Sequence, residues 1–351
     1  MDRFSYPTQY ELREVLSSIT NRSFLNTFAQ RKGIFITNVT LDKLAIEIAE
    51  LFLDEDDLEL IRAEAYQYSS NNTLSGFTVK SPNANFSLRD VYQDIFENGE
   101  RKPGLVLNAL VKVSNEVGVF KGSLEYNRKR PGRIQFLQDE INSFTFYLKD
   151  LGNQSWQVEI DGNRSTDLRE LQKLLEKGLR REDEFEELEQ KNLTSDKAVL
   201  FFDELAKQGM SEDWLFEDVK HLTLKMGSDV DEEELVEVSQ ANEEQLLGIS
   251  QAILQGKNLR ENPFVQQSVK NGYRFSAMTY EFSHKSDPIT LNIKAEFKGR
   301  PKVFEVSIGS VFEKSGSAAK RVLASLSEAE NRRIRSQFWN NSKVCYHALV
   351  S

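Results

Sequence analysis

The fold class follows from residues 273–311, which have the sequence YRFSAMTYEFSHKSDPITLNIKAEFKGRPKVFEVSIGSV. Apolar and polar residues alternate along three segments of this stretch, and a period of two is typical of strands that bury one face. The segments are Tyr273–Phe282, Ile289–Phe297 and Val303–Val311, and turn-forming residues separate them at 283–288 and 298–301. The stretch therefore predicts an antiparallel meander of three strands.

A second region, earlier in the chain, has the same period. From about Gly104, candidate strands cover 105–113, 118–126, 133–137, 143–148 and 156–160. Helical spacing predicts helices over 8–20, 23–31, 41–52 and 54–66, from 166 to about 191, over most of 195–256, and over 317–338. Within 195–256, the alternation of Lys220–Lys225 is also compatible with a short strand. Residues 69–85 predict a loop, and 344–350 an edge strand. We therefore predict an α+β fold, with an N-terminal helical module followed by two antiparallel sheet regions with helical connectors.

The length of 351 residues exceeds that of a typical single domain, so we predict three domains. Residues 1–68 form the helical module, and residues 86–191 form a meander plus a helix. Residues 195–351 begin with an acidic helical connector and continue with an antiparallel sheet and a C-terminal helix. The repeated order of helices, meander and helix is what a duplication would produce, but no residue-level similarity supports one.

Composition bears on the cellular compartment. The chain holds one cysteine, Cys345, so no internal disulfide framework can form. No run of about 18 apolar residues occurs, so no membrane-spanning helix is predicted. The segment Met1–Pro7 lacks the apolar core of a secretory signal. We expect a cytoplasmic protein without a membrane partner.

Charge is distributed unevenly along the chain. Residues 181–256 hold 21 acidic and 6 basic side chains, a net charge of −15, whereas residues 257–351 hold 8 acidic and 16 basic ones, a net charge of +8. Residues 1–180 add −3, which gives the formal net charge of −10. This asymmetry predicts either a face that binds a polyanion or a partner protein, or internal pairing between the two segments.

The first candidate site is a basic surface over residues 294–335. Cations beside aromatic side chains suit phosphate contact combined with base stacking, and Phe338 and Trp339 follow these cations directly. The alternative is that the cations pair internally or with a partner protein, and that both aromatic residues belong to the core. The candidate nucleic-acid-binding residues are Lys294, Lys298, Arg300, Lys302, Lys320, Arg321, Arg332, Arg333 and Arg335.

The second candidate site lies within residues 24–53. The pattern there is Phe24-Leu25-x-x-Phe28-Ala29-x-x-x-Gly33-Ile34, an extended stretch, and then Asp42-Lys43-Leu44-Ala45-x-x-Ile48-Ala49-x-Leu51-Phe52. Two short helices around an extended turn resemble the helix–extended loop–helix modules of SAP domains and of the N-terminal module of Rho. Those modules usually bind nucleic acid, so the resemblance implies that Arg31, Lys32 and Lys43 contact phosphates. A small helical packing domain is the alternative, because acidic residues offset these cations.

A metal-dependent nuclease is the enzymatic alternative. Asp287 precedes Glu296-Phe297-Lys298 by the length of a strand, which is similar to the D…(D/E)xK pattern. In that pattern two carboxylates hold a divalent metal and the lysine positions the attacking water. Alternation places Glu296 and Lys298 on one strand face, whereas Asp287 lies in the preceding turn. If the face is only solvated, no catalytic residue, cofactor or metal is expected.

Other catalytic motifs are missing from the sequence. It contains no P-loop, no dinucleotide fingerprint and no nucleophile elbow, and one cysteine with three scattered histidines completes no zinc site. We therefore expect binding and not catalysis, in a nucleic-acid-associated or assembly component with a partner protein, as in a bacterial defence-type complex. The acidic segment 181–256 would compete for the basic surface. A scaffold or inhibitor whose acidic segment imitates nucleic acid is the remaining alternative.

Overall fold

The computed structural model describes residues 6–18, 22–35, 39–67, 73–99, 103–114, 116–129, 139–162, 165–226, 251–299, 302–315, 320–324 and 326–350. The chain divides into two compact units. The first comprises Met1–Asn71, Arg101–Leu107 and Leu124–Ser143, and the second comprises Asn72–Glu100, Asn108–Ser123 and Phe144–Ser351.

Helices form the N-terminal module of the first unit. They are α1 (Gln9–Ser18), α2 (Arg22–Arg31), α3 (Leu41–Ala49) and α4 (Glu55–Gln67). Their apolar faces meet in one core that includes the fully buried Leu16, Leu25, Leu44 and Ile61. The helical module predicted from the apolar spacing is confirmed. The first unit also contains β2 (Leu105–Leu107), which pairs with residues 124–126 of β4 (Val119–Lys129).

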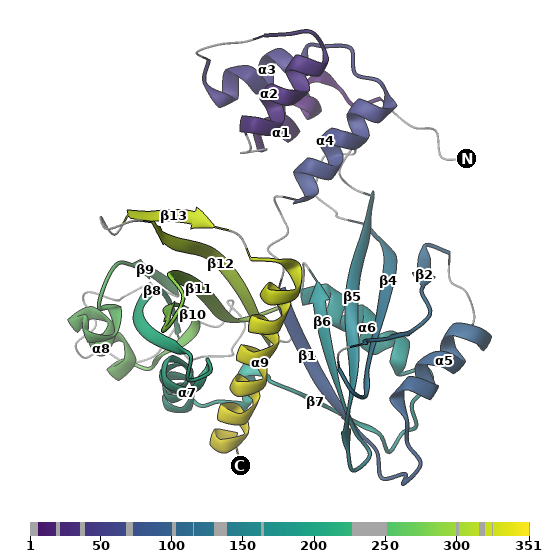
Figure 1. The fold of residues 1–351 in the computed structure, drawn as a ribbon, viewed down its shortest axis with the longest axis vertical. Helices are drawn as coiled ribbons and strands as arrows, with labels where there is room; N and C mark the ends of the chain where they lie inside the picture. Colours follow the sequence, from purple (N-terminus) through teal and green to yellow (C-terminus); the bar gives the residue numbers. More distant parts are fainter. Residues whose placement is uncertain are drawn as a thin grey trace, which may run out of the picture. The chain divides into compact units, whose positions relative to one another are not determined.

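An antiparallel sheet organises the second unit, in the order β4-β5-β6-β1-β12-β11-β10-β8-β9 (Figure 1). The first half of this order contains β1 (Thr73–Lys80), β5 (Asp139–Gly152) and β6 (Ser155–Gly162), and β3 (Val111–Lys112) pairs with β4. The second half contains β8 (Trp214–Met226), β9 (Gln251–Gln255), β10 (Tyr273–His284), β11 (Ile289–Lys298) and β12 (Val303–Ser315), and β13 (Lys320–Ala324) pairs with β12. The predicted α+β fold with two antiparallel sheet regions is confirmed.

Strand β1 joins the two sheet regions. One edge of β1 pairs with β6 along its whole length. The other edge pairs with β12 only at Thr73 and Leu74, and then with β7 (Glu184–Glu187) from Phe77 to Lys80. Because β7, and not β12, pairs with this edge from Phe77 to Lys80, the sheet branches at β1.

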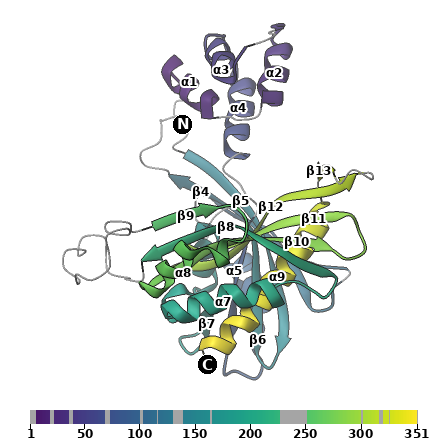
Figure 2. The same cartoon turned by 90° about the vertical axis from the view of Figure 1, so that its left-hand side faces the viewer.

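Helices complete the second unit. In the first half, α5 (Leu88–Asn98) packs against α6 (Ser165–Leu175), which lies on β6 and β1. In the second half, α7 (Ser195–Gln208) and α9 (Glu328–Val350) lie side by side (Figures 1 and 2), and α8 (Pro263–Lys270) contacts β10. The largest core lies beneath α7 and α9 and includes Phe201, Phe304 and Trp339. Helix α9 also contacts both β1 and β12, so it covers the branch point.

Several sequence-based assignments are wrong. Residues 73–80 form the central strand β1 and not a loop, because its polar residues meet polar groups of α9 and β6. The helix predicted from 166 ends at Leu175, and the acidic stretch beyond it forms β7 and the 3-10 helix Gln190–Asn192. Residues 214–226 and 251–255 are strands, although most of 195–256 was predicted to be helical. Residues 320–324 are strand β13, and residues 344–350 belong to α9 and not to an edge strand. The candidate strand 133–137 lies outside the described residues.

Candidate nucleic-acid interface and other sites

The module resemblance rests on how α2 and α3 are connected. Gly33 ends α2 with a φ of 76°, a left-handed conformation that glycine adopts without strain. The guanidinium of Arg22, at the start of α2, donates to the carbonyl oxygen of Val39 over 2.6 Å. Thr40 then caps α3, because its Oγ1 accepts a hydrogen bond from the N–H of Lys43. Val39 therefore lies beside the start of α2, and the N-termini of α2 and α3 lie near each other.

This geometry separates the three predicted cations of the module. Lys43, in the first turn of α3, lies at the same end as Arg22, whereas Arg31 ends α2 about 15 Å away along the helix. Arg31 and Lys43 are exposed, and neither forms a salt bridge with another described residue. Lys32 contacts the carboxylates of Asp54 and Asp57, and these hydrogen bonds raise its pKa. The prediction that Lys32 contacts phosphate is therefore corrected: it ties α2 to the start of α4.

Two arginines of the predicted C-terminal surface are structural. Arg335 is buried, with a side chain 1% exposed, and its Nη1 lies 2.8 Å from Asp161 Oδ1 on β6. Arg332 lies 2.9 Å from the carboxylate of Glu116, and its guanidinium stacks 3.5 Å from the ring centroid of Tyr147. Their partners belong to β6, β5 and the segment before β4, and the described part of the acidic segment 181–256 does not pair with them. Both arginines are therefore removed from the binding surface.

The aromatic residues expected beside these cations are also internal. Phe338 and Trp339 are fully buried in the core of the second half. The opposite face of α9 is polar: Ser336 donates to Glu159, Asn340 accepts from Gln157, and Lys343 donates to Thr78. Burial and the neighbouring cations lower the pKa of Lys343 and of His347 despite the nearby Glu186 carboxylate. The helix therefore connects an apolar core on one side with a polar layer on the other.

The remaining predicted cations do not form one patch. Lys298 and Lys302 flank the turn between β11 and β12, whereas Lys320 and Arg321 pair with Ser315 and Lys314 at the other end of β12. The thirteen residues from Val303 to Ser315 extend over about 40 Å in a strand. Lys294 forms a salt bridge of 2.6 Å with Glu296 on its own strand. Arg333 is exposed on α9, and Arg300 lies outside the described residues.

The nuclease arrangement is contradicted by the hairpin geometry. Asp287 lies in the turn before β11, where its backbone N–H donates to His284 Nδ1 over 3.0 Å. Glu296 lies seven residues beyond Ile289, so about 23 Å of strand backbone separates Glu296 from the end of the turn that holds Asp287. Among the described residues, no group of three or more His, Cys, Asp or Glu side chains could hold a metal ion. Asp287, Glu296 and Lys298 therefore do not converge on one point.

Glu305 is a buried titratable residue that the sequence reasoning missed. It lies directly opposite Glu296 in the β11–β12 ladder and is 2% exposed. Burial, helped by Glu296 and Asp167 and opposed by Lys298 and Lys294, raises the pKa of Glu305 to about 7. Its Oε2 is shielded and has no hydrogen-bond partner among the described residues. The hairpin register could have paired the two glutamates, but their burial depends on the rest of the fold.

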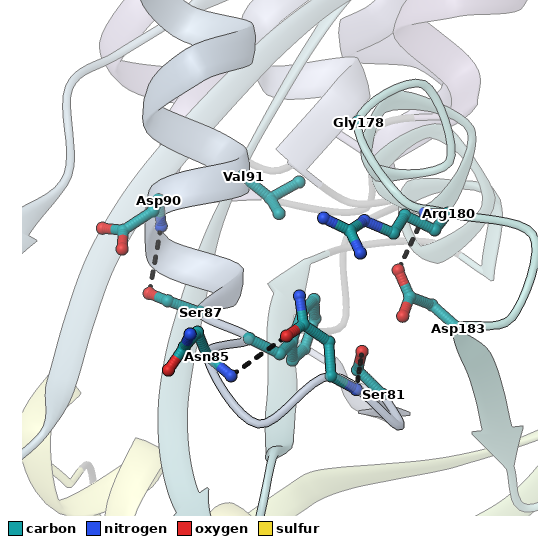
Figure 3. A pocket seen from close by; sticks show the side chains of 10 residues that line it. Ser81, Asn85, Ser87, Asp90, Val91, Gly178, Arg180 and Asp183 are labelled. Atoms are coloured by element: carbon teal, nitrogen blue, oxygen red, sulfur yellow. Dashed lines mark hydrogen bonds between the residues drawn. The ribbon is translucent and has the colours of Figure 1, made fainter.

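A polar cavity of about 230 Å³ lies between the β1–α5 connection and the loop after α6 (Figure 3). It lies wholly within the second unit, and no sequence motif indicated it. Ser87 caps α5 at one wall, with its Oγ accepting from the N–H of Asp90 over 3.3 Å. At the opposite wall, Asp183 Oδ2 accepts from the backbone N–H of Arg180 over 2.8 Å. The cavity has charged and polar walls in a region far from the predicted sites in sequence.

Comparison with known proteins does not identify a family. No protein-family model matches the sequence, and no curated protein matches it. Two solved structures are weakly similar to this chain. One is the di-domain ARO/CYC StfQ from the steffimycin biosynthetic pathway, with 10% identity over 79% of this chain and 97% of that chain, and a TM-score of 0.17. The other is DynU16, from the dynemicin biosynthetic locus, with 11% identity over 79% of this chain and 99% of that chain, and a TM-score of 0.17. TM-scores this low support no statement about fold or function.

The described helices also bear on the membrane prediction. None of them combines the length and the apolar character that a bilayer span requires.

Proposed function

We propose that the protein is a nucleic-acid-associated or assembly component whose helical module contacts phosphate groups. The observation that carries this proposal is that the N-termini of α2 and α3 lie near each other, which places Arg22 and Lys43 at the same end of the module. Arg22 donates to a neutral carbonyl oxygen, so its positive charge is not cancelled by that contact. Two helix N-termini with adjacent cations favour a negatively charged ligand.

The salt bridges of the other predicted cations also favour the helical module as the phosphate-binding surface. Arg332, Arg335 and Lys294 have carboxylate partners in the second unit, which leaves them little capacity for an external anion. In the module, Arg31 and Lys43 keep exposed charges, and Phe35 between α2 and α3 is 79% exposed. An exposed aromatic ring beside cations suits stacking with an unpaired base.

Acidic residues limit the strength of this interaction. Asp42 lies next to Lys43 in the first turn of α3, and Asp54 and Asp57 already bind Lys32. We therefore expect modest affinity that depends strongly on salt. No described residue bears on a defence-type complex, so that role stays a prediction. The run Asp231–Glu234, which was expected to compete for the basic surface, lies outside the described residues.

Fluorescence anisotropy tests the proposal directly. A labelled 20-nucleotide single strand and a 20-base-pair duplex are titrated with the full chain at low salt. Lys43→Gln should weaken binding about fivefold, the equivalent of about 1 kcal/mol. Lys270→Gln, which removes an exposed lysine at the end of α8, is the matched control and should leave the affinity unchanged. Equal effects of the two substitutions, or no binding to either probe, would refute the proposal.

A further inference from the structure

Strand β9 has one unpaired edge among the described residues. Residues Gln251–Gln255 pair with β8 on one side (Figure 2), and no described strand pairs with the other side. An unpaired strand edge carries a row of N–H and C=O groups that can pair with a further strand. We propose that this edge pairs antiparallel with β9 of a second copy of the chain, so that the sheets of the two copies become continuous.

The ladder with β8 shows which backbone groups of β9 point outward. The N–H of Gly256 donates to the carbonyl oxygen of Lys220 over 3.1 Å. Hydrogen bonds to one neighbour involve every second residue of an antiparallel strand, and this ladder has no register shift, so the alternate residues counted back from Gly256 also bond to β8. The residues between them point their N–H and C=O groups away from β8. These residues are Gln251, Ile253 and Gln255.

The sequence of β9 is self-complementary about its centre. It reads Gln-Ala-Ile-Leu-Gln, with a polar residue at each end and three apolar residues between them. An antiparallel pair centred on Ile253 places Gln251 of one copy opposite Gln255 of the other, and likewise Ala252 opposite Leu254. Every outward-pointing residue then lies in a hydrogen-bonded pair, which gives about six backbone hydrogen bonds across the interface. A twofold contact uses the same patch twice, so this symmetry favours a second copy over an unrelated peptide.

Side chains on both faces of the strand favour the same pairing. Ile253 is 68% exposed, and in the pair it would lie directly against Ile253 of the second copy. Ala252 and Leu254 point to the other face and are partly buried against the core of the second half of the sheet. Their pairing across the interface would extend that core. Apolar surface is therefore removed from water on both faces, which stabilises the pair.

The edge lacks the features that usually block the addition of a strand. Lysine, proline or a bulge protects many natural edges, whereas β9 contains no charged residue, no proline and no register shift. In the ladder with β8, Lys225 lies beside Gln251 and His221 lies beside Gln255. The twofold relation places Lys225 of one copy in the same row as His221 of the other, so no two lysines share a row. An interface of five residue pairs is small, and we expect a weak dimer that dissociates on dilution.

Sedimentation velocity of the full chain at rising protein concentration, from the low micromolar range upward, tests the contact. The unmodified protein should change from monomer toward dimer. Ile253→Lys places two like charges opposite each other at the centre of the interface, so it should keep the protein monomeric without loss of folding. Val344→Lys, the same change at an exposed apolar residue of α9, is the control and should leave the association unchanged.

Cysteine cross-linking under a mild oxidant tests the register and separates this pair from non-specific aggregation. Ile253→Cys places the two new cysteines in one hydrogen-bonded pair, with Cα atoms about 5.5 Å apart, which a disulfide can span. Gln251→Cys is the matched control, because an offset of four residues along the strand separates its two copies by about 14 Å or more. The natural Cys345 is buried and should not form the cross-link.

A dimer that forms with rising concentration, that Ile253→Lys abolishes and that Ile253→Cys alone cross-links would support the pairing. A monomer at every concentration, a dimer that Ile253→Lys leaves intact, or equal cross-linking of the two cysteine variants would overturn it. None of these measurements involves nucleic acid, so their result is independent of the proposed phosphate contact.

Discussion

Arg335 on α9 and Asp161 on β6 form an ion pair in which the arginine is buried and the aspartate is 14% exposed, with 2.8 Å between Nη1 and Oδ1. Their positions are 174 residues apart in the sequence. The pair connects the helix that covers the second half of the sheet with a strand of the first half. This contact explains why Arg335 is not available to an external ligand.

Removing this arginine should destabilise the protein strongly. Arg335→Met leaves the Asp161 carboxylate without its cation in a site of low exposure, and breaking a buried pair costs about 3–5 kcal/mol. Urea unfolding should show a loss of about 3 kcal/mol in the free energy of unfolding. The neighbouring Arg333→Met, at an exposed position, is the control and should change stability by no more than about 0.5 kcal/mol. Similar unfolding midpoints for the two variants would show that the pair is not structural.

Gly76 should be intolerant of a side chain. A Cβ at this position of β1 would lie 2.4 Å from the carbonyl oxygen of Val158 and 3.0 Å from Cζ2 of Trp339. Gly76→Ala should therefore lower the free energy of unfolding by about 2 kcal/mol or more, because the backbone oxygen cannot move aside cheaply. Gly309→Ala in β12 is the control, since its nearest atom is 3.9 Å away. A Gly76→Ala protein as stable as the control would contradict the close contact of α9 with β1.

Glu305 should make stability depend on pH. Its pKa of about 7 in the folded protein exceeds its ordinary value of 4.5, so the folded state binds the proton more tightly than the unfolded state does. The stabilisation is complete below about pH 4.5, falls as pH rises toward 7, and is absent above pH 7. The total is about 3 kcal/mol. Glu305→Gln cannot ionise, so its stability relative to the unmodified protein should increase between pH 5 and pH 8.

Chemical unfolding at several pH values measures this difference. Glu313→Gln, an exposed change on the same strand, is measured alongside as the comparison. If the Glu305→Gln difference does not vary with pH, the Glu305 carboxyl group is not held in its protonated form near neutral pH.

The sequence predicted the parts of the fold whose signals are local. Gly33 marked the end of α2 and Thr40 the start of α3. Alternation from Tyr273 onward located β10, β11 and β12. Strand β1 was not predicted because Thr73, Ser75 and Thr78 are polar, although all three are buried in the structure. Contacts across the sheet and with α9 are what allow these polar side chains to be buried. Local polarity cannot reveal a partner that lies elsewhere in the chain.

The candidate sites show the same limit. The charge of Arg332 and Arg335 was visible in the sequence, but their carboxylate partners come from 116 and 161, and no spacing rule connects such distant positions. The cavity near Asp183 combines two loops separated by about a hundred residues, none of which forms a motif. By contrast, the pairing of Glu296 with Glu305 follows from the length of the β11–β12 turn.

We propose that the helical module, and not the C-terminal third, contacts phosphate. The affinity of the full chain for a 20-nucleotide single strand, measured from 25 to 300 mM salt, tests it most directly. Three phosphate contacts, from Arg22, Arg31 and Lys43, predict a slope of log K against log salt of about −2, which Lys43→Gln should reduce by about 0.7. Arg333→Gln should leave the slope as it is. A slope near zero, or one reduced by Arg333→Gln and not by Lys43→Gln, would contradict the claim.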